Sequence, residues 1–220
     1  MVCLTTALAT LLIAALPETA YGKTAYAKTA HEKTGVGVTR EPTCAPGTVG
    51  LGRHEVWRLG ARGTARLCAV RGFPSRSAES TPGSRWYVAG ARGRVIVQAR
   101  VSGRVAALHR RAQRRGLSLA ATSSYRTMAH QQALCRADAR CSRGDYTYVA
   151  RPGHSAHQLA VAIDFRGTSV RGRLTCGAGR ARDGHSRVWR FLQDHARDFG
   201  FRQYAPESWH WDATGWRHRC

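Results

Sequence analysis

Seven cysteines constrain the fold of this 220-residue chain more than any other feature. Cys3 lies in an apolar N-terminal run that we expect to be removed, which leaves an even set: Cys44, Cys68, Cys135, Cys141, Cys176 and Cys220. An even set in an exported chain is typical of a disulfide framework. The short spacing favours Cys135–Cys141 first, with Cys44–Cys68 and Cys176–Cys220 to follow, although spacing leaves the connectivity open. The lack of a Cys-x-x-Cys pair argues against a cysteine metal site.

The N-terminus predicts a secretory signal. Val2 to Leu16 form an uncharged apolar run that is too short to span a membrane comfortably, and Ala25-Tyr26-Ala27 offers a small-x-small cleavage site. No Lys or Arg precedes the run, so a buried N-terminal helix is the alternative. We expect a signal peptide over 1–27 that is cleaved near Ala27, a low-complexity linker over 28–43 and one domain over 44–220. The protein would then be secreted and extracytoplasmic.

The charge balance is strongly basic. Lys and Arg total 35 against 13 acidic residues, a formal net charge of +22, and only Lys23, Lys28 and Lys33 are lysines. Such a charge fits nucleic acid, anionic lipid or anionic wall polymers. No helix-turn-helix or zinc-finger pattern is present, and export would separate the chain from DNA, so we expect no nucleic-acid partner. Anionic wall polymers remain candidate partners, and we expect a monomer.

Hydrophobic spacing predicts an α+β domain. Helices are expected over 100–115, 127–139 and 186–199, with Thr127 and Ser186 as N-caps and with Gly116 and Gly200 as stops. Strands are expected over 117–123, 161–165 and 208–212, and a loop over 73–84. The helices and strands alternate without repeated βαβ units, which favours a small central antiparallel sheet flanked by helices.

Three polar clusters lie in apolar surroundings. They are Ser123 to Gln131, Gly153 to Asp164, and Glu207 to Trp211. Within them, His157, Asp164 and His210 offer two imidazoles and one carboxylate, which suit a catalytic zinc ion with one open position. Glu207 precedes His210 by three residues and is placed to act as a general base.

Each of these residues also has a purely structural interpretation. Asp164 fits a buried partner of an arginine, His157 a surface or capping histidine, and His210 a packed core histidine between two tryptophans. Arg126 fits one more solvated arginine, and Trp209 fits core packing as well as a pocket wall. The joint occurrence of the clusters favours the functional interpretation.

The clusters together resemble the VanY-type D-alanyl-D-alanine carboxypeptidases, a family of zinc D,D-peptidases. That family carries Ser-x-Tyr-Arg-(Ser/Thr)-x-x-x-x-Gln, then Ser-x-His-x-x-Gly-x-Ala-x-Asp, then Glu-x-Trp-His-Trp. The corresponding segments here are Ser123 to Gln131, Ser155 to Asp164 and Glu207 to Trp211, within about residues 95–212. Ala160 replaces the family glycine, and a positive φ there would strain the backbone.

The resemblance implies a D,D-peptidase-like (hedgehog-like) fold and hydrolysis of D-Ala-D-Ala bonds in peptidoglycan stem peptides by metal-activated water. It assigns zinc to His157, Asp164 and His210, the base to Glu207, the oxyanion contact to Arg126, and substrate contacts to Arg126, Gln131 and Ser155. Carboxypeptidase, endopeptidase and dipeptidase activities stay open. The alternative from another class is a non-catalytic protein that binds the cell wall or polyanions on the same fold.

Overall fold

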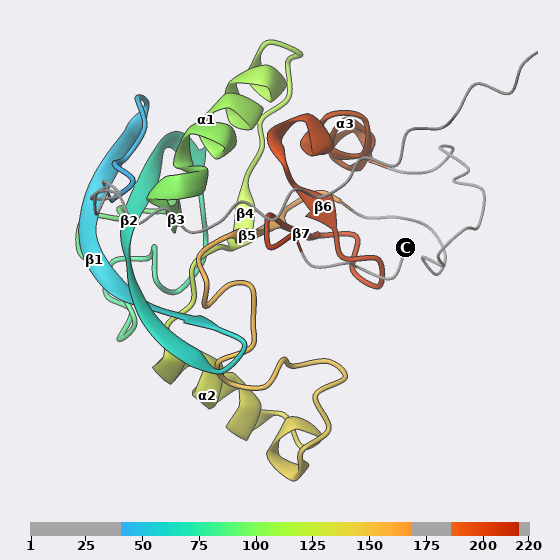
Figure 1. Ribbon diagram of the computed structural model, residues 1–220. Helices are drawn as coiled ribbons and strands as arrows, with labels where there is room; N and C mark the ends of the chain where they lie inside the picture. The colour runs from blue at the N-terminus through green and yellow to red at the C-terminus, as the bar shows by residue number, and fades with distance from the viewer. Residues whose placement is uncertain (1–40, 169–185, 216–220) are drawn as a thin grey trace, which may run out of the picture. The chain divides into compact units, whose positions relative to one another are not determined.

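The computed structural model describes residues 41–168 and 186–215, which form two small antiparallel sheets and three α-helices (Figure 1). The first sheet has the order β1-β2-β3, and the second β4-β5-β7-β6. The strands are β1 (Thr48–Arg58), β2 (Ala61–Pro74), β3 (Arg94–Gln98), β4 (Ala121–Ser123), β5 (Ala162–Phe165), β6 (Arg202–Gln203) and β7 (His210–Asp212). The helices are α1 (Ala99–Gln113), α2 (Met128–Ala137) and α3 (Arg187–His195), with 3-10 turns at Cys141–Arg143 and Ala196–Phe199. The α+β prediction is confirmed.

The three predicted helices are present, and local chemistry explains their ends. Thr127 accepts a hydrogen bond from the backbone N–H of His130, and Ser186 accepts one from Trp189, so both act as N-caps. Gly116 and Gly200 have φ of +65° and +75°, the left-handed conformation that glycine adopts without steric cost. The helix expected over 186–199 closes as a 3-10 turn after His195.

Helix α1 packs on the sheet of the long hairpin (Figure 1). Its buried stripe is Val101, Val105, Leu108 and Ala112, the apolar positions that predicted the helix. Full burial of one such Val or Leu side chain stabilises the fold by about 1.5–3 kcal/mol. This core therefore anchors α1 and, through it, the connection that enters β4.

The predicted strands are shorter than expected. The strand expected over 117–123 pairs only over Ala121–Ser123, because Gly116 turns the chain and the N–H of Leu117 still bonds to Ala112. The strands expected over 161–165 and 208–212 form as β5 and β7. Strands β1, β2, β3 and β6 were not predicted, and the first three of them form a second sheet beside the expected one.

Both disulfide pairs that lie in the described residues confirm the pairing favoured by spacing. Cys44 bonds to Cys68, and Cys135 bonds to Cys141. Cys176 and Cys220 lie outside the described residues, as does nearly all of the predicted leader and linker, so the domain boundaries stay a prediction. Within 41–168 and 186–215, no helix is long and apolar enough to cross a membrane.

Candidate metal centre

Strand pairing brings the second and third polar clusters together. Asp164 on β5 is the register partner of His210 on β7. Directly opposed residues on antiparallel strands hold their side chains close on one face of the sheet. The two residues are 46 positions apart in the chain but in contact in the fold, where the Nδ1 of His210 lies 3.0 Å from the Oδ1 of Asp164.

His157 completes the cluster from a loop. Its Nε2 lies 3.2 Å from the Oδ1 of Asp164 and 3.2 Å from the Nδ1 of His210. Its other ring nitrogen, Nδ1, lies 2.6 Å from the backbone oxygen of Ser124. That contact requires Nδ1–H to donate, so Nε2 carries the lone pair toward the cluster. The three donor atoms all lie within 4.8 Å of one another, an arrangement able to hold a metal ion.

Burial and charge set the protonation states in this cluster. Burial lowers the pKa of His157, which favours a neutral imidazole. Burial alone would raise the pKa of Asp164, but the charges and hydrogen bonds of His157 and His210 hold it far below its usual range. The cluster therefore presents an ionised carboxylate beside a neutral imidazole.

A second carboxylate supports His210 from behind. The Nε2 of His210 lies 3.5 Å from the Oδ2 of Asp212, whose side chain is buried. Asp212 was not among the predicted site residues. Its position did carry a signal, because it follows His210 by two on β7, and residues i and i+2 of a strand share a face. A carboxylate on the far nitrogen fixes the tautomer and the ring orientation of a histidine whose near nitrogen binds a metal.

Glu207 lies at the edge of the cluster. Its Oε2 is 3.9 Å from the Nδ1 of His210, and its side chain is 30% exposed, so solvent reaches it. Burial raises the pKa of Glu207, and the nearby charge of Asp164 raises it further, whereas His210 and Arg126 oppose the shift. A carboxylate with a raised pKa is suited to accept and then return a proton near neutral pH.

Arg126 approaches the same cluster from the end of β4. Its guanidinium donates to the Oε1 of Gln131 at 2.9 Å and to the Oγ of Ser123 at 3.0 Å. Its Nε is buried and has no hydrogen-bond partner among the described residues. Burial lowers the pKa of Arg126, and the charges of Asp164, Glu79 and Glu207 counteract the shift. The arginine therefore holds a fixed position close to the two acidic residues of the cluster.

Gln131 and Ser155, which were expected to contact substrate, both make hydrogen bonds within the protein. The Gln131 side chain is fully buried, and its Nε2 donates to the backbone oxygen of Ala150 at 2.7 Å. Both ends of its amide are thus used, one of them to hold Arg126. The Oγ of Ser155 accepts from the backbone N–H of His157 at 3.3 Å, which supports the turn that carries the histidine. These contacts favour positioning roles for both residues.

A buried carboxylate that the sequence analysis missed fixes helix α2 beside Arg126. Glu79, which is 1% exposed, accepts from the backbone N–H of Thr127 at 3.0 Å and contacts the Nδ1 of His130 at 2.8 Å. Trp86 stacks on the His130 ring at 4.0 Å. These contacts give His130 a structural role. Glu79 lies in a Ser- and Pro-rich loop, where no pattern indicated a buried acid.

Two further expectations concern single residues. Ala160 has φ of +56°, the strained conformation expected where the family has glycine, and an alanine there costs about 1–2 kcal/mol. Trp209 is 47% exposed, so the core-packing interpretation of this residue is wrong. An exposed indole between Glu207 and His210 is instead available to a ligand.

The hairpin β1–β2 braces the loop that carries His157. The N–H of Trp57 donates to the backbone oxygen of Gln158 at 3.1 Å, and the N–H of Gly60 donates to Gly153 at 3.0 Å. A Cβ on Gly153 would lie 3.3 Å from the Cα of Gly60, and its φ of +89° is one that glycine adopts without strain, so both features favour glycine there. The loop is thus held from a sheet that the sequence analysis did not foresee.

Fold and cluster together define an α+β protein with one candidate mononuclear metal centre of two histidines and one aspartate in its described part. A comparison with known protein families identifies the family within this class. The family model of VanY, D-alanyl-D-alanine carboxypeptidase, matches residues 94–215, more than half of the chain. The chain belongs to this family, and the resemblance stated from the three motifs is confirmed.

Solved structures of related proteins resemble the chain at low identity. A mutant of the vancomycin resistance D,D-pentapeptidase VanY in complex with Zn(II) is 24% identical, with a TM-score of 0.42 over 56% of this chain and 75% of that chain. VanYB in complex with D-alanine-D-alanine is 22% identical, with a TM-score of 0.43 over the same shares, 56% and 75%. DacB from Streptococcus pneumoniae D39 is 21% identical, with a TM-score of 0.38 over 76% and 88%. A search of curated proteins finds no match.

Proposed function

We propose that the protein is an exported, zinc-dependent peptidase that hydrolyses the D-Ala-D-Ala bond of peptidoglycan stem peptides. Membership of the D-alanyl-D-alanine carboxypeptidase family supports the substrate class. The observation that carries the mechanism is the convergence of His157, Asp164 and His210 within 4.8 Å, with Glu207 beside them. The disulfides support an oxidising compartment outside the cytoplasm.

The donor set fits zinc. Two imidazole nitrogens and one carboxylate oxygen are ligands that zinc accepts, and three protein ligands leave one position for water or substrate. The lowered pKa values of His157 and Asp164 favour the neutral imidazole and the ionised carboxylate that binding requires. Once bound, zinc would supply a lowered pKa for the attacking water and polarisation of the substrate carbonyl.

The protein's own groups would carry out the proton transfer and the charge stabilisation. Glu207 takes the proton from the attacking water and passes it to the amine that leaves, so no covalent intermediate with the enzyme is needed. Arg126 directs its guanidinium toward the negative charge that develops on the carbonyl oxygen of the scissile bond. Its closeness to Asp164 and Glu207, whose charges raise its pKa against burial, supports this role. Gln131 and Ser123 keep the guanidinium in place.

The finer substrate choice has three candidates: carboxypeptidase, endopeptidase and dipeptidase action on wall peptides. Export favours the first two, and the family description favours the first. Anionic wall polymers are proposed as further partners of a monomeric protein. The rival proposal is a wall-binding protein without catalysis, and the position of Glu207 at the edge of the cluster argues against it, because binding alone needs no base.

Incubation of the protein with a soluble stem pentapeptide should release one D-alanine. We expect mass spectrometry to show loss of a single terminal residue, suppression by a chelator, and recovery on addition of Zn²⁺. Cleavage between two inner residues would move the assignment to an endopeptidase. Full activity after complete metal removal would overturn the zinc proposal.

Zinc binding should strengthen as the pH rises to about 9. Burial lowers the pKa of His210, but the carboxylates of Asp164 and Asp212 beside its two ring nitrogens outweigh burial and raise the pKa to about 9 in the metal-free protein. A protonated imidazole cannot bind zinc, so about one proton must leave at pH 7. Affinity should therefore rise nearly tenfold per pH unit between about pH 7 and 9, and level off above. Calorimetry in buffers of different ionisation enthalpy measures the proton release, and a constant affinity over that range would contradict the expectation.

A further inference from the structure

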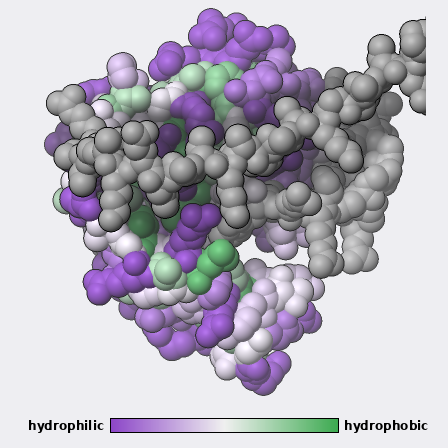
Figure 2. Space-filling view, in the orientation of Figure 1, coloured by the Kyte–Doolittle hydropathy of each residue, from purple (hydrophilic) through white to green (hydrophobic). Residues whose placement is uncertain are grey.

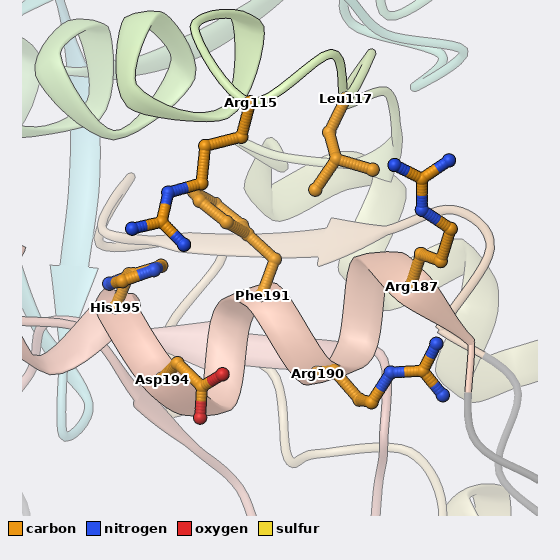
Figure 3. A pocket seen from close by; sticks show the side chains of 7 residues that line it. All are labelled: Arg115, Leu117, Arg187, Arg190, Phe191, Asp194 and His195. Carbon is orange, nitrogen blue, oxygen red and sulfur yellow. The ribbon is translucent and has the colours of Figure 1, made fainter.

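A pocket outside the metal centre lies between the end of α1 and helix α3 (Figure 3). Its volume is about 240 Å³. Leu117 and Phe191 supply the apolar side chains that line it, and arginines come from both elements: Arg115 after α1, and Arg187 and Arg190 from α3. None of these residues belongs to the three motif clusters. The pocket is thus a separate feature of the domain.

The pocket carries more positive charge than its surroundings neutralise. Arg115 and Arg187 are exposed and make no ion pair with the described residues, and Asp194 is the one acidic residue among those that line the pocket. Figure 3 shows the Arg115 side chain near His195 at one end, while Arg187 extends beside Leu117 at the other. Like charges held on two elements around one pocket repel one another unless an anion lies between them.

Helix electrostatics do not explain these arginines. Cations stabilise the C-terminal end of a helix and disfavour the N-terminal end. Arg187 and Arg190 lie at the start of α3, whose first turn has no acidic residue. Arg187, as the first residue of the helix, therefore holds its positive charge where the helix dipole disfavours it, at a cost to the helix. A bound anion would remove this cost and the mutual repulsion together.

The surface around the pocket is also positively charged. Helix α1 contains no acidic residue and ends with Arg110 and Arg111, followed by Arg114 and Arg115. Figure 2 shows the end of α1, at the top of the view, as hydrophilic. A chain of anionic groups could therefore extend from the pocket along the end of α1, whereas a single small ion would use only part of this charge.

We propose that this pocket and the end of α1 bind a phosphodiester-linked polyol polymer of the cell wall. Guanidinium groups match the oxygens of phosphate in a planar, two-pronged geometry. Leu117, which is half-buried, offers apolar contact to the carbon backbone between the phosphates, whereas little of the Phe191 ring is exposed. Single-stranded nucleic acid is the less suitable phosphodiester, because its bases need exposed aromatic rings to stack on, and Phe191 is only 5% exposed. The choice of a wall polymer rests on the proposed function at the cell wall, although binding at this pocket does not require hydrolysis at the metal centre.

The experiment compares two double variants of equal net charge. Arg115→Gln with Arg187→Gln changes the pocket, and Arg53→Gln with Arg62→Gln removes two exposed arginines of the β1–β2 hairpin as the matched control. Binding of fluorescent poly(glycerol phosphate) is measured by anisotropy over a series of salt concentrations. The pocket variant should bind at least about tenfold more weakly and lose about 1.5 from the slope of log affinity against log salt. The control should change less than about twofold.

Two outcomes would overturn the inference. Equal losses in both double variants would reduce the binding to overall charge and remove the pocket's role. Tighter binding of a single-stranded oligonucleotide than of poly(glycerol phosphate), lost in the pocket variant, would assign the surface to nucleic acid instead. Hydrolysis of a soluble pentapeptide by the pocket variant serves as the check on folding, and it should equal that of the wild type.

Discussion

Replacement of Glu207 by glutamine should lower kcat for stem-peptide hydrolysis by about 10³-fold while zinc stays bound. Glutamine keeps the size of the side chain but cannot accept and return a proton, and general acid–base catalysis contributes about 10²–10⁴. The raised pKa of Glu207, caused first by burial and then by Asp164, prepares it for this transfer. The measurement is kcat on a soluble pentapeptide, together with the zinc content of the purified variant.

Glu41→Gln is the matched control for this variant. Glu41 pairs with Arg53 and Arg66 at a partly exposed position outside the segment matched by the family model. Its loss should leave kcat within about twofold, because exposed ion pairs contribute little. A Glu207→Gln protein that holds zinc and releases D-alanine at the wild-type rate would refute the assigned base, and loss of zinc in this variant would make the residue a ligand.

The candidate metal site could be predicted from sequence, because its three residues all lie within short motifs. His157, Asp164 and His210 each lie in a short polar stretch inside apolar surroundings, and strand spacing then brings Asp164 opposite His210. The helices could be predicted equally well from local signals. Thr127 and Ser186 are the N-caps of α2 and α3, and Gly116 and Gly200 follow the ends of α1 and of the turn after α3. What remains a prediction is the role of each residue, because side chains in contact do not by themselves establish catalysis.

The first sheet could not be predicted, because its turn lacks the usual residues. The β1–β2 hairpin turns at Leu59 and Gly60, both with positive φ, where Asn-Gly or Asp-Gly is the common signal. Leucine in the left-handed region costs about 1–2 kcal/mol. The sequence gives no reason for this strain. The structure supplies one, since the turn lies against Gly153 and holds the loop of His157.

The supporting residues were missed for a different reason. Gln131 and Glu79 are buried polar side chains whose partners, Arg126, Ala150 and His130, are decided by tertiary structure. A motif shows that a glutamine follows the arginine, but it does not show which group its amide will contact. These contacts favour a positioning role for Gln131, in which it keeps Arg126 in one orientation, and its contact with substrate stays a prediction.

Arg126→Lys should lower kcat by about 10²–10³-fold with a small change in KM. Removal of one donor that contacts a developing oxyanion has a cost of this size, and lysine cannot reproduce the planar fork that bonds to Gln131 and Ser123. The loss should fall on kcat because the charge develops in the transition state. Steady-state kinetics on the pentapeptide gives the two constants separately.

Rescue by a small cation separates catalysis from folding. In an Arg126→Ala protein, added guanidinium can occupy the space of the lost side chain, and we expect it to restore part of kcat, whereas ammonium at the same concentration should restore much less. Arg92→Ala, at an exposed surface position outside the motifs, should respond to neither cation. If Arg126→Ala retains zinc and its native near-UV circular dichroism but shows unchanged kcat, Arg126 takes no part in the reaction, and its buried position serves the fold alone.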